Sequence, residues 1–166
     1  MTPFVDRLSR APLAHDPERG AEAWAALSGS VPPELKDLIE GASGSSPHLA
    51  GLLGREAEWI APVLAAPPEE AMAGLLSDAR EAASAPRDLG ARLRRAKRRV
   101  ALLTGLADLG GVWGLEEVTG ALSDFADAAV EAALDGLLAE EIERGRLPEA
   151  PGLVSIAMGK GGAREL

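Results

Sequence analysis

The chain has 166 residues, of which 46% are hydrophobic, and this is enough to bury a core without covalent staples. It contains no Cys, which excludes disulfides, thiolate metal sites and cysteine nucleophiles and is compatible with the cytoplasmic location that we expect. A net charge of -9 argues against nucleic acid as a partner, and the longest uncharged apolar run, residues 60–68, is too short and too rich in Pro to cross a membrane.

The first half of the chain predicts a series of short helices. Ala, Leu, Glu and Arg are abundant and aromatic residues are scarce, which favours helix over strand. Asp16 and Ser46 each precede a Pro, the pattern of an N-cap followed by the first helical residue. The expected elements are a helix from Asp16 to Gly29, a short helix from Pro32 to about Gly41, a loop over residues 41–46, a helix from Ser46 through Ile60 and a helix over residues 68–84.

Two longer helices are predicted after residue 87. Apolar residues recur at spacings of three and four from Asp88 until Gly110 and Gly111 end the pattern. A second amphipathic segment runs from Leu115 to about Arg144, and the short turn between the two segments predicts an antiparallel hairpin. We expect the second helix to carry the following residues on one apolar face: Val118, Leu122, Phe125, Ala129, Ala133 and Leu137.

The pattern changes over the last residues of the chain. Residues 152–158, Gly-Leu-Val-Ser-Ile-Ala-Met, favour a buried strand that leads into the glycine turn Gly-Lys-Gly-Gly of residues 159–162. A single strand cannot satisfy its backbone donors and acceptors, and no second clear strand precedes it. We therefore expect the chain to be incomplete.

Residues 157–166, Ala-Met-Gly-Lys-Gly-Gly-Ala-Arg-Glu-Leu, resemble the opening of a nucleotidyltransferase domain in the bifunctional glutamine synthetase adenylyltransferase/adenylyl-removing enzymes. Residues 46–50, 93–99 and 109–122 resemble the N-terminal half of the same family. The resemblance implies an enzyme of nitrogen metabolism with two nucleotidyltransferase-like halves. The first half removes AMP from glutamine synthetase by phosphorolysis and the second attaches AMP from ATP. This chain would come from the first half and would be inactive alone.

Pattern and resemblance together predict a mainly α fold. A helical bundle would lead into the first strand of a truncated nucleotidyltransferase-like α/β domain. The expected regions are an N-terminal helical region at 1–86, a long helical hairpin at 87–145 and the incomplete nucleotidyltransferase-like domain at 146–166.

The resemblance also implies the site and its ligands. The backbone of the glycine turn would face the phosphates, so the candidate nucleotide- and phosphate-binding residues are Gly159, Lys160, Gly161, Gly162 and Arg164. The catalytic acidic pair that holds Mg²⁺ is expected beyond Leu166, so no catalytic or metal-binding residue is predicted within the chain. The expected partners are glutamine synthetase, nucleotide, phosphate and a nitrogen-signalling regulatory protein.

Each of these features also has a structural interpretation. The glycine cluster suits an anion-binding nest or a plain turn, and Lys160 and Arg164 suit phosphate binding or solvent exposure. The carboxylates at 124, 127, 131 and 135 share a helix face that predicts a solvated surface rather than a metal site. His15 and His48 are isolated, which predicts structural or exposed positions.

A basic run is concentrated in one helix of this acidic chain: Arg92, Arg94, Arg95, Lys97, Arg98 and Arg99. It suits a solvated helix face or a surface that steers an acidic ligand. The alternative hypothesis to the enzyme is therefore a helical interaction module that uses this basic helix for docking and performs no catalysis. A nucleotidyltransferase that acts on nucleic acid is disfavoured by the net negative charge.

Overall fold

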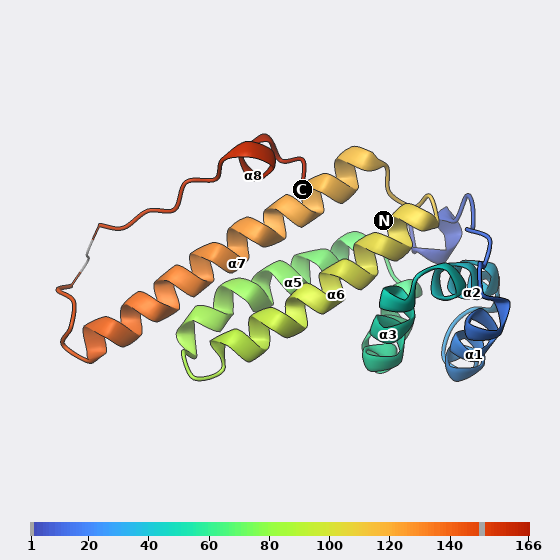
Figure 1. Ribbon diagram of the computed structural model, residues 1–166, viewed down its shortest axis with the longest axis horizontal. Coiled ribbons are helices and arrows are strands. Elements are labelled where there is room, and N and C mark those ends of the chain that lie inside the picture. The colour runs from blue at the N-terminus through green and yellow to red at the C-terminus, as the bar shows by residue number, and fades with distance from the viewer. Residues whose placement is uncertain (1, 150–151) are drawn as a thin grey trace.

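The computed structural model describes residues 2–149 and 152–166. This part of the chain is mainly helical, which confirms the mainly α part of the predicted fold class (Figure 1). The predicted strand is not among the elements of the described residues. No helix within it is long and apolar enough to cross a membrane. The elements in chain order are the 3-10 turn η1 (Val5–Arg7), α1 (Pro17–Leu27), the 3-10 turn η2 (Pro33–Leu35), α2 (Lys36–Ser45), α3 (Pro47–Arg55), α4 (Ala57–Leu64), α5 (Pro68–Glu81), the 3-10 turn η3 (Ala82–Ser84), α6 (Leu89–Leu109), α7 (Leu115–Glu143) and α8 (Gly159–Ala163).

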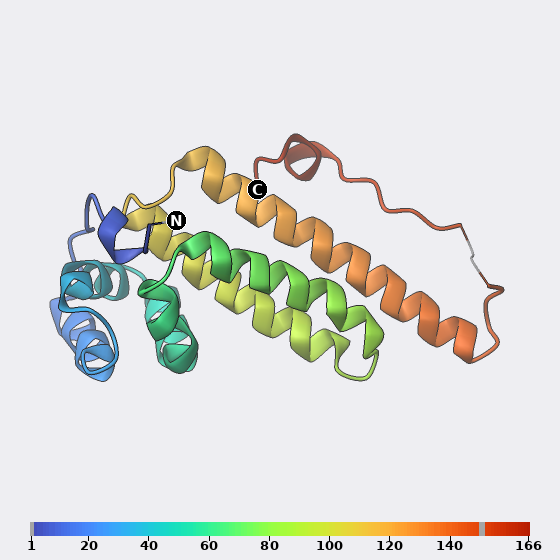
Figure 2. The same cartoon turned by 180° about the vertical axis from the view of Figure 1, so that it is seen from behind.

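The helices form two groups that meet at α6. Helices α5, α6 and α7 lie side by side as a long layer, while α1, α2 and α3 cluster at one end of it (Figures 1 and 2). Helix α6 contacts α5 and α7 and also α2 and α3. The predicted hairpin of α6 and α7 is confirmed, and Gly111 and Gly145 take positive φ angles of 64° and 69° after the two helices end.

The predicted N-caps of α1 and α3 are confirmed. The Asp16 carboxylate accepts the N–H of Arg19 at 3.1 Å, and the Ser46 hydroxyl accepts the N–H of Leu49 at 3.2 Å. The helix predicted from Ser46 through Ile60 is instead two helices, because Glu56 interrupts it between α3 and α4. Glu56 is buried, and its side chain binds α6.

The loop predicted over residues 41–46 is wrong, because α2 continues to Ser45. Its glycines serve close packing. A Cβ on Gly41 would lie 2.8 Å from the carbonyl carbon of Pro12, and a Cβ on Gly44 would lie 2.6 Å from the Cβ of Ala14. Gly20 of α1 approaches the backbone of α2 in the same way. Small residues therefore let the N-terminal segment and α1 pack directly on α2.

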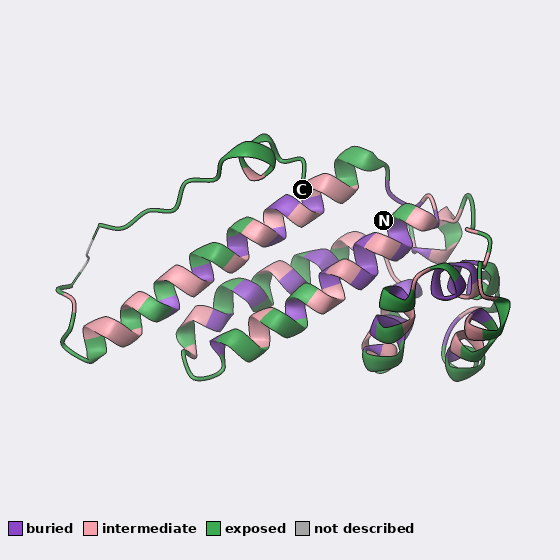
Figure 3. Ribbon diagram, in the orientation of Figure 1, coloured by how far each residue is buried: buried purple, intermediate pink, exposed green. Residues whose placement is uncertain are grey.

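The buried faces of the three long helices point toward one another (Figure 3). Phe125 of α7 is buried as predicted, but Leu137 is exposed, so the predicted apolar face is wrong at its C-terminal end. The buried residues at this end of α7 are Ala132 and Gly136. A Cβ on Gly136 would come within 2.8 Å of the side chain of Leu89. Only small residues fit where α7 meets the start of α6.

The predicted strand at 152–158 does not form in the described residues. This segment is irregular and runs past α7 with its apolar side chains in solvent, and Val154 and Ile156 are each 80% exposed (Figure 1). The described residues offer it no neighbouring strand, so its backbone has no sheet to join.

Candidate functional site

The predicted glycine turn forms the five-residue helix α8. Gly159 begins it with a φ angle of 57°, a left-handed conformation that glycine adopts without strain. The N–H of Gly162 donates to the carbonyl of Met158 at 3.4 Å, and the N–H of Glu165 donates to that of Lys160 at 2.9 Å. The N–H of Gly162 is thus used inside the turn, while Lys160 lies exposed on its surface.

Arg164 connects this segment to α7. Its Nη2 donates to Oδ1 of Asp124 at 2.6 Å, and both side chains are about half exposed. The hydrogen bond to Asp124 raises the pKa of Arg164 above its already high value, so the guanidinium stays charged. Arg164 is therefore held by an ion pair rather than free in solvent. The pair is solvent-exposed, which leaves Arg164 able to exchange Asp124 for another anion.

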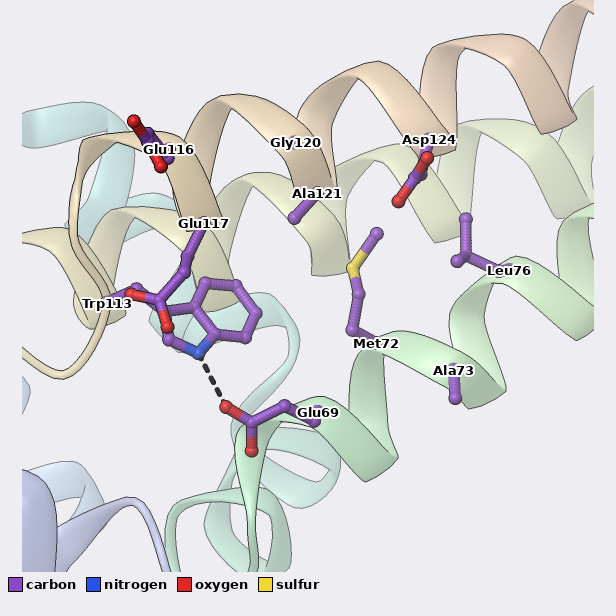
Figure 4. Close-up of a pocket in the computed structure, with 10 residues that line it drawn as sticks. All are labelled: Glu69, Met72, Ala73, Leu76, Trp113, Glu116, Glu117, Gly120, Ala121 and Asp124. Atoms are coloured by element: carbon purple, nitrogen blue, oxygen red, sulfur yellow. Dashed lines mark hydrogen bonds between the residues drawn. The ribbon is translucent and has the colours of Figure 1, made fainter. Parts of the chain in front are cut away.

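A groove lies next to this pair, between the start of α5 and the first half of α7 (Figure 4). Its volume is about 400 Å³. We call it the acidic groove, because its lining combines an apolar floor with four carboxylates and contains no basic residue. The apolar part consists of Met72, Ala73, Leu76, Trp113, Gly120 and Ala121, and the carboxylates are Glu69, Glu116, Glu117 and Asp124.

Glu69 lies at one end of the acidic groove and is held there by two hydrogen bonds. Its Oε1 accepts hydrogen bonds from Arg7 and from Nε1 of Trp113, the latter at 2.9 Å (Figure 4). Burial acts to raise the pKa of Glu69, but the hydrogen bonds from Arg7 and Trp113 outweigh it and the pKa lies below its usual value. Arg7 also donates to the carbonyl of Val112 at 2.8 Å, so it ties the α6–α7 turn to the groove.

Three of the six residues of the basic run bind other groups of this chain. Nε of Arg98 and Nε of Arg99 donate to the two carboxylate oxygens of Glu56 at 3.0 and 2.8 Å. The Arg99 guanidinium also stacks 5.0 Å from the ring centre of Trp59, and Arg92 donates to two backbone carbonyls at the end of α5. The remaining members, Arg94, Arg95 and Lys97, are exposed.

Sequence reasoning missed Glu56 and the acidic groove. Glu56 and Glu58 both lie between Leu53 and Ile60, and no local signal marks Glu56 as the buried one, because its two arginine partners lie more than 40 positions away. Asp127, Glu131 and Asp135 are exposed as predicted, and so are both histidines. Within residues 2–149 and 152–166, no three His, Cys, Asp or Glu side chains gather as a metal site.

Comparison with known proteins identifies the relatives of the chain. The family profile described as glutamate-ammonia ligase adenylyltransferase matches residues 36–166. The bifunctional glutamine synthetase adenylyltransferase/adenylyl-removing enzyme of Caulobacter vibrioides is 38% identical over 100% of this chain and 18% of its own length. The enzymes of the same name from Rhodopseudomonas palustris and Bradyrhizobium diazoefficiens are 37% and 40% identical over 99% and 91% of this chain, and over 19% and 16% of their own lengths.

The chain thus spans less than a fifth of the length of these relatives. No solved structure matches it. The profile match and the relatives together show that the chain belongs to the glutamate-ammonia ligase adenylyltransferase family.

Proposed function

We propose that the chain is part of the adenylyl-removing half of an enzyme that adenylylates and deadenylylates glutamine synthetase. The observation that carries the proposal is the family match, which continues through the glycine segment to residue 166. In the reaction, an oxygen of inorganic phosphate attacks the phosphorus of the attached AMP. The bond between AMP and glutamine synthetase breaks, ADP leaves, and the protein is restored.

In this proposal, residues 146–166 begin a nucleotidyltransferase-like domain. The exposed apolar side chains of residues 152–158 favour burial in a sheet, for which the rest of the complete protein would supply the neighbouring strands. The turn at Gly159 would place backbone N–H groups toward phosphate, and Lys160 and Arg164 would neutralise its charge. A nitrogen-signalling protein would act on the complete enzyme.

Mg²⁺ does not fit the residues described in this chain, which offer no metal-binding cluster. Its ligands in the complete enzyme are therefore proposed to lie outside these 166 residues, and the contribution of this chain is to position phosphate. Phosphoryl and nucleotidyl transfer depends mainly on such positioning and on charge stabilisation.

Gly159→Val tests this role in the protein at the full length of its relatives. We expect phosphorolysis of adenylylated glutamine synthetase to fall at least about 100-fold, because a β-branched residue disfavours the φ angle of 57° and blocks close approach of phosphate. Lys160→Ala should cost roughly ten- to 100-fold, the value of one charge-assisted contact. ADP release measures both effects.

Gly145→Val is the matched control, since Gly145 has a φ angle of 69° and equally open surroundings but lies at the end of α7. It imposes similar backbone strain away from the glycine segment and should retain activity. Near-normal phosphorolysis by Gly159→Val would show that the turn is only structural.

The alternative, an interaction module with a basic docking helix, loses support from the contacts of α6. Arg92, Arg98 and Arg99 bind groups of this chain, so only part of the basic run is available to a partner. The family match also favours the enzyme.

A further inference from the structure

We propose that the acidic groove is a docking site for a cationic amphipathic helix of a protein partner. This inference is independent of the role of the glycine segment in phosphate binding. It rests on the shape of the groove, on its charge and on the cation that already lies at its edge.

The groove between α5 and α7 has a shape into which a third helix could pack. Met72 and Leu76 of α5 point toward α7, and Ala121 of α7 points toward them (Figure 4). A Cβ on Gly120 would meet no atom within 4 Å, so the α7 side of the groove is open. Small residues on both walls allow the backbone of an incoming helix to approach, and apolar side chains give it an area to bury.

The charge of the groove selects a cationic partner. Its lining includes four carboxylates and no Lys or Arg; Arg7 pairs with Glu69 and Arg164 with Asp124 from beside the groove, while Glu116 and Glu117 have no ion-pair partner among the described residues. The excess continues along the whole of α7, which contains nine acidic residues and no basic residue: Glu116, Glu117, Asp124, Asp127, Glu131, Asp135, Glu140, Glu141 and Glu143. An apolar ridge flanked by Lys or Arg complements this surface, whereas nucleic acid and acidic proteins are repelled.

Arg164 shows that the edge of the groove accepts a guanidinium. Its pair with Asp124, at 2.6 Å, brings a cation from outside the two walls to one of the lining carboxylates. Asp127 and Glu131, one and two helical turns further along α7, line a separate hollow against residues 155–158 of this chain. The groove itself combines its carboxylates with an apolar floor, which a small amine would leave uncovered, so we assign a protein segment as the occupant.

The test uses the 166-residue chain and a designed helical peptide with Leu on one face and Lys and Arg beside it. We expect a salt-sensitive complex that shifts the NMR signal of the Trp113 indole N–H, because this group lies at the groove. Gly120→Leu, which fills the floor, and Glu116→Lys, which reverses one charge, should each weaken binding by at least about tenfold.

Two controls match these variants. Gly74→Leu adds the same side chain at an open helical position outside the groove, and Glu143→Lys makes the same charge change at the far end of α7. Both should bind the peptide within about twofold of the unchanged chain.

Several results would overturn the proposal. These are failure of the cationic peptide to bind, equal binding of a peptide with Glu in place of Lys and Arg, and unchanged binding by both groove variants. If spermidine alone reproduced the Trp113 shift at the same affinity, the occupant would be a small polyamine. If the chain dimerised and Gly120→Leu abolished the dimer, the occupant would be a second copy.

Discussion

Replacing Gly41 with Ala is expected to lower the free energy of unfolding by about 3 kcal/mol, because α2 has no room for a side chain at this position. The added Cβ would lie 2.8 Å from the carbonyl carbon of Pro12 and closer still to its oxygen. These are backbone atoms, so no rotamer change can relieve the contact. The segment that contains Pro12 is also held in place, since the N–H groups of Ser9 and Arg10 donate to the carbonyl of Gly110 at 3.0 and 3.3 Å.

Gly51→Ala and Gly54→Ala are the matched controls for this prediction. Both glycines lie within α3, and a Cβ on either would meet no atom within 4 Å. Here Ala should raise the free energy of unfolding by roughly 0.5–1 kcal/mol, since Gly is the poorer helix former. Urea unfolding followed by circular dichroism measures all three changes. Equal effects at positions 41 and 51 would contradict the close packing of α2.

Replacing Glu56 with Ala is expected to cost about 2–3 kcal/mol of stability at neutral pH. The carboxylate is 5% exposed and binds both Arg98 and Arg99, so its removal leaves two guanidinium groups without their partner. Loss of one member of a fully buried pair costs roughly 3–5 kcal/mol. The two arginines are 38% and 24% exposed, so water solvates them in part and the cost is smaller.

The same site predicts a pH dependence. Burial acts to raise the pKa of Glu56, but the hydrogen bonds and charges of Arg99 and Arg98 outweigh it, so the folded-state pKa lies below the ordinary value of 4.5. The contribution of Glu56 is therefore complete above that value and is lost as the pH falls from there through the lowered folded-state pKa. Glu56→Gln should flatten the decline in stability in this acidic window.

Urea unfolding at a series of pH values from neutral to about pH 3 checks this prediction. Glu58→Gln provides the control, because Glu58 lies two residues further along, in the first turn of α4, but is exposed and has no ion-pair partner among the described residues. If Glu56→Gln and Glu58→Gln gave parallel curves, the ion pair would make no net contribution to folding.

Most of the helices were predictable from the sequence because their signals are local. Apolar spacing, the N-caps at Asp16 and Ser46 and the glycines after α6 and α7 are all read within a few residues. The use of Gly41 was not predictable in this way. Glycine favours turns when it is read locally, but here its role is set by Pro12, almost 30 positions earlier.

The same difference between local signals and long-range contacts applies to the candidate site. The glycine cluster permits the left-handed conformation that Gly159 adopts, whereas the pairing of Arg164 with Asp124 joins residues 40 positions apart and has no local signal. The acidic groove exists only because α5 and α7 become neighbours. The β-prone pattern of residues 152–158 predicted a strand that does not form, because a strand also needs a partner strand and the described residues contain none.

The position of α6 between the two helical groups makes folding of the chain cooperative. Its residues Leu102, Leu103 and Leu106 are fully buried, and they belong to one continuous core that extends from Phe4 to Ala128. Proteolytic cleavage in the loop before α6 would leave α5 on a separate fragment from the helices that cover its apolar face. Neither fragment would keep a complete core, so the two groups of helices are joint parts of one folding unit rather than modules that can be exchanged.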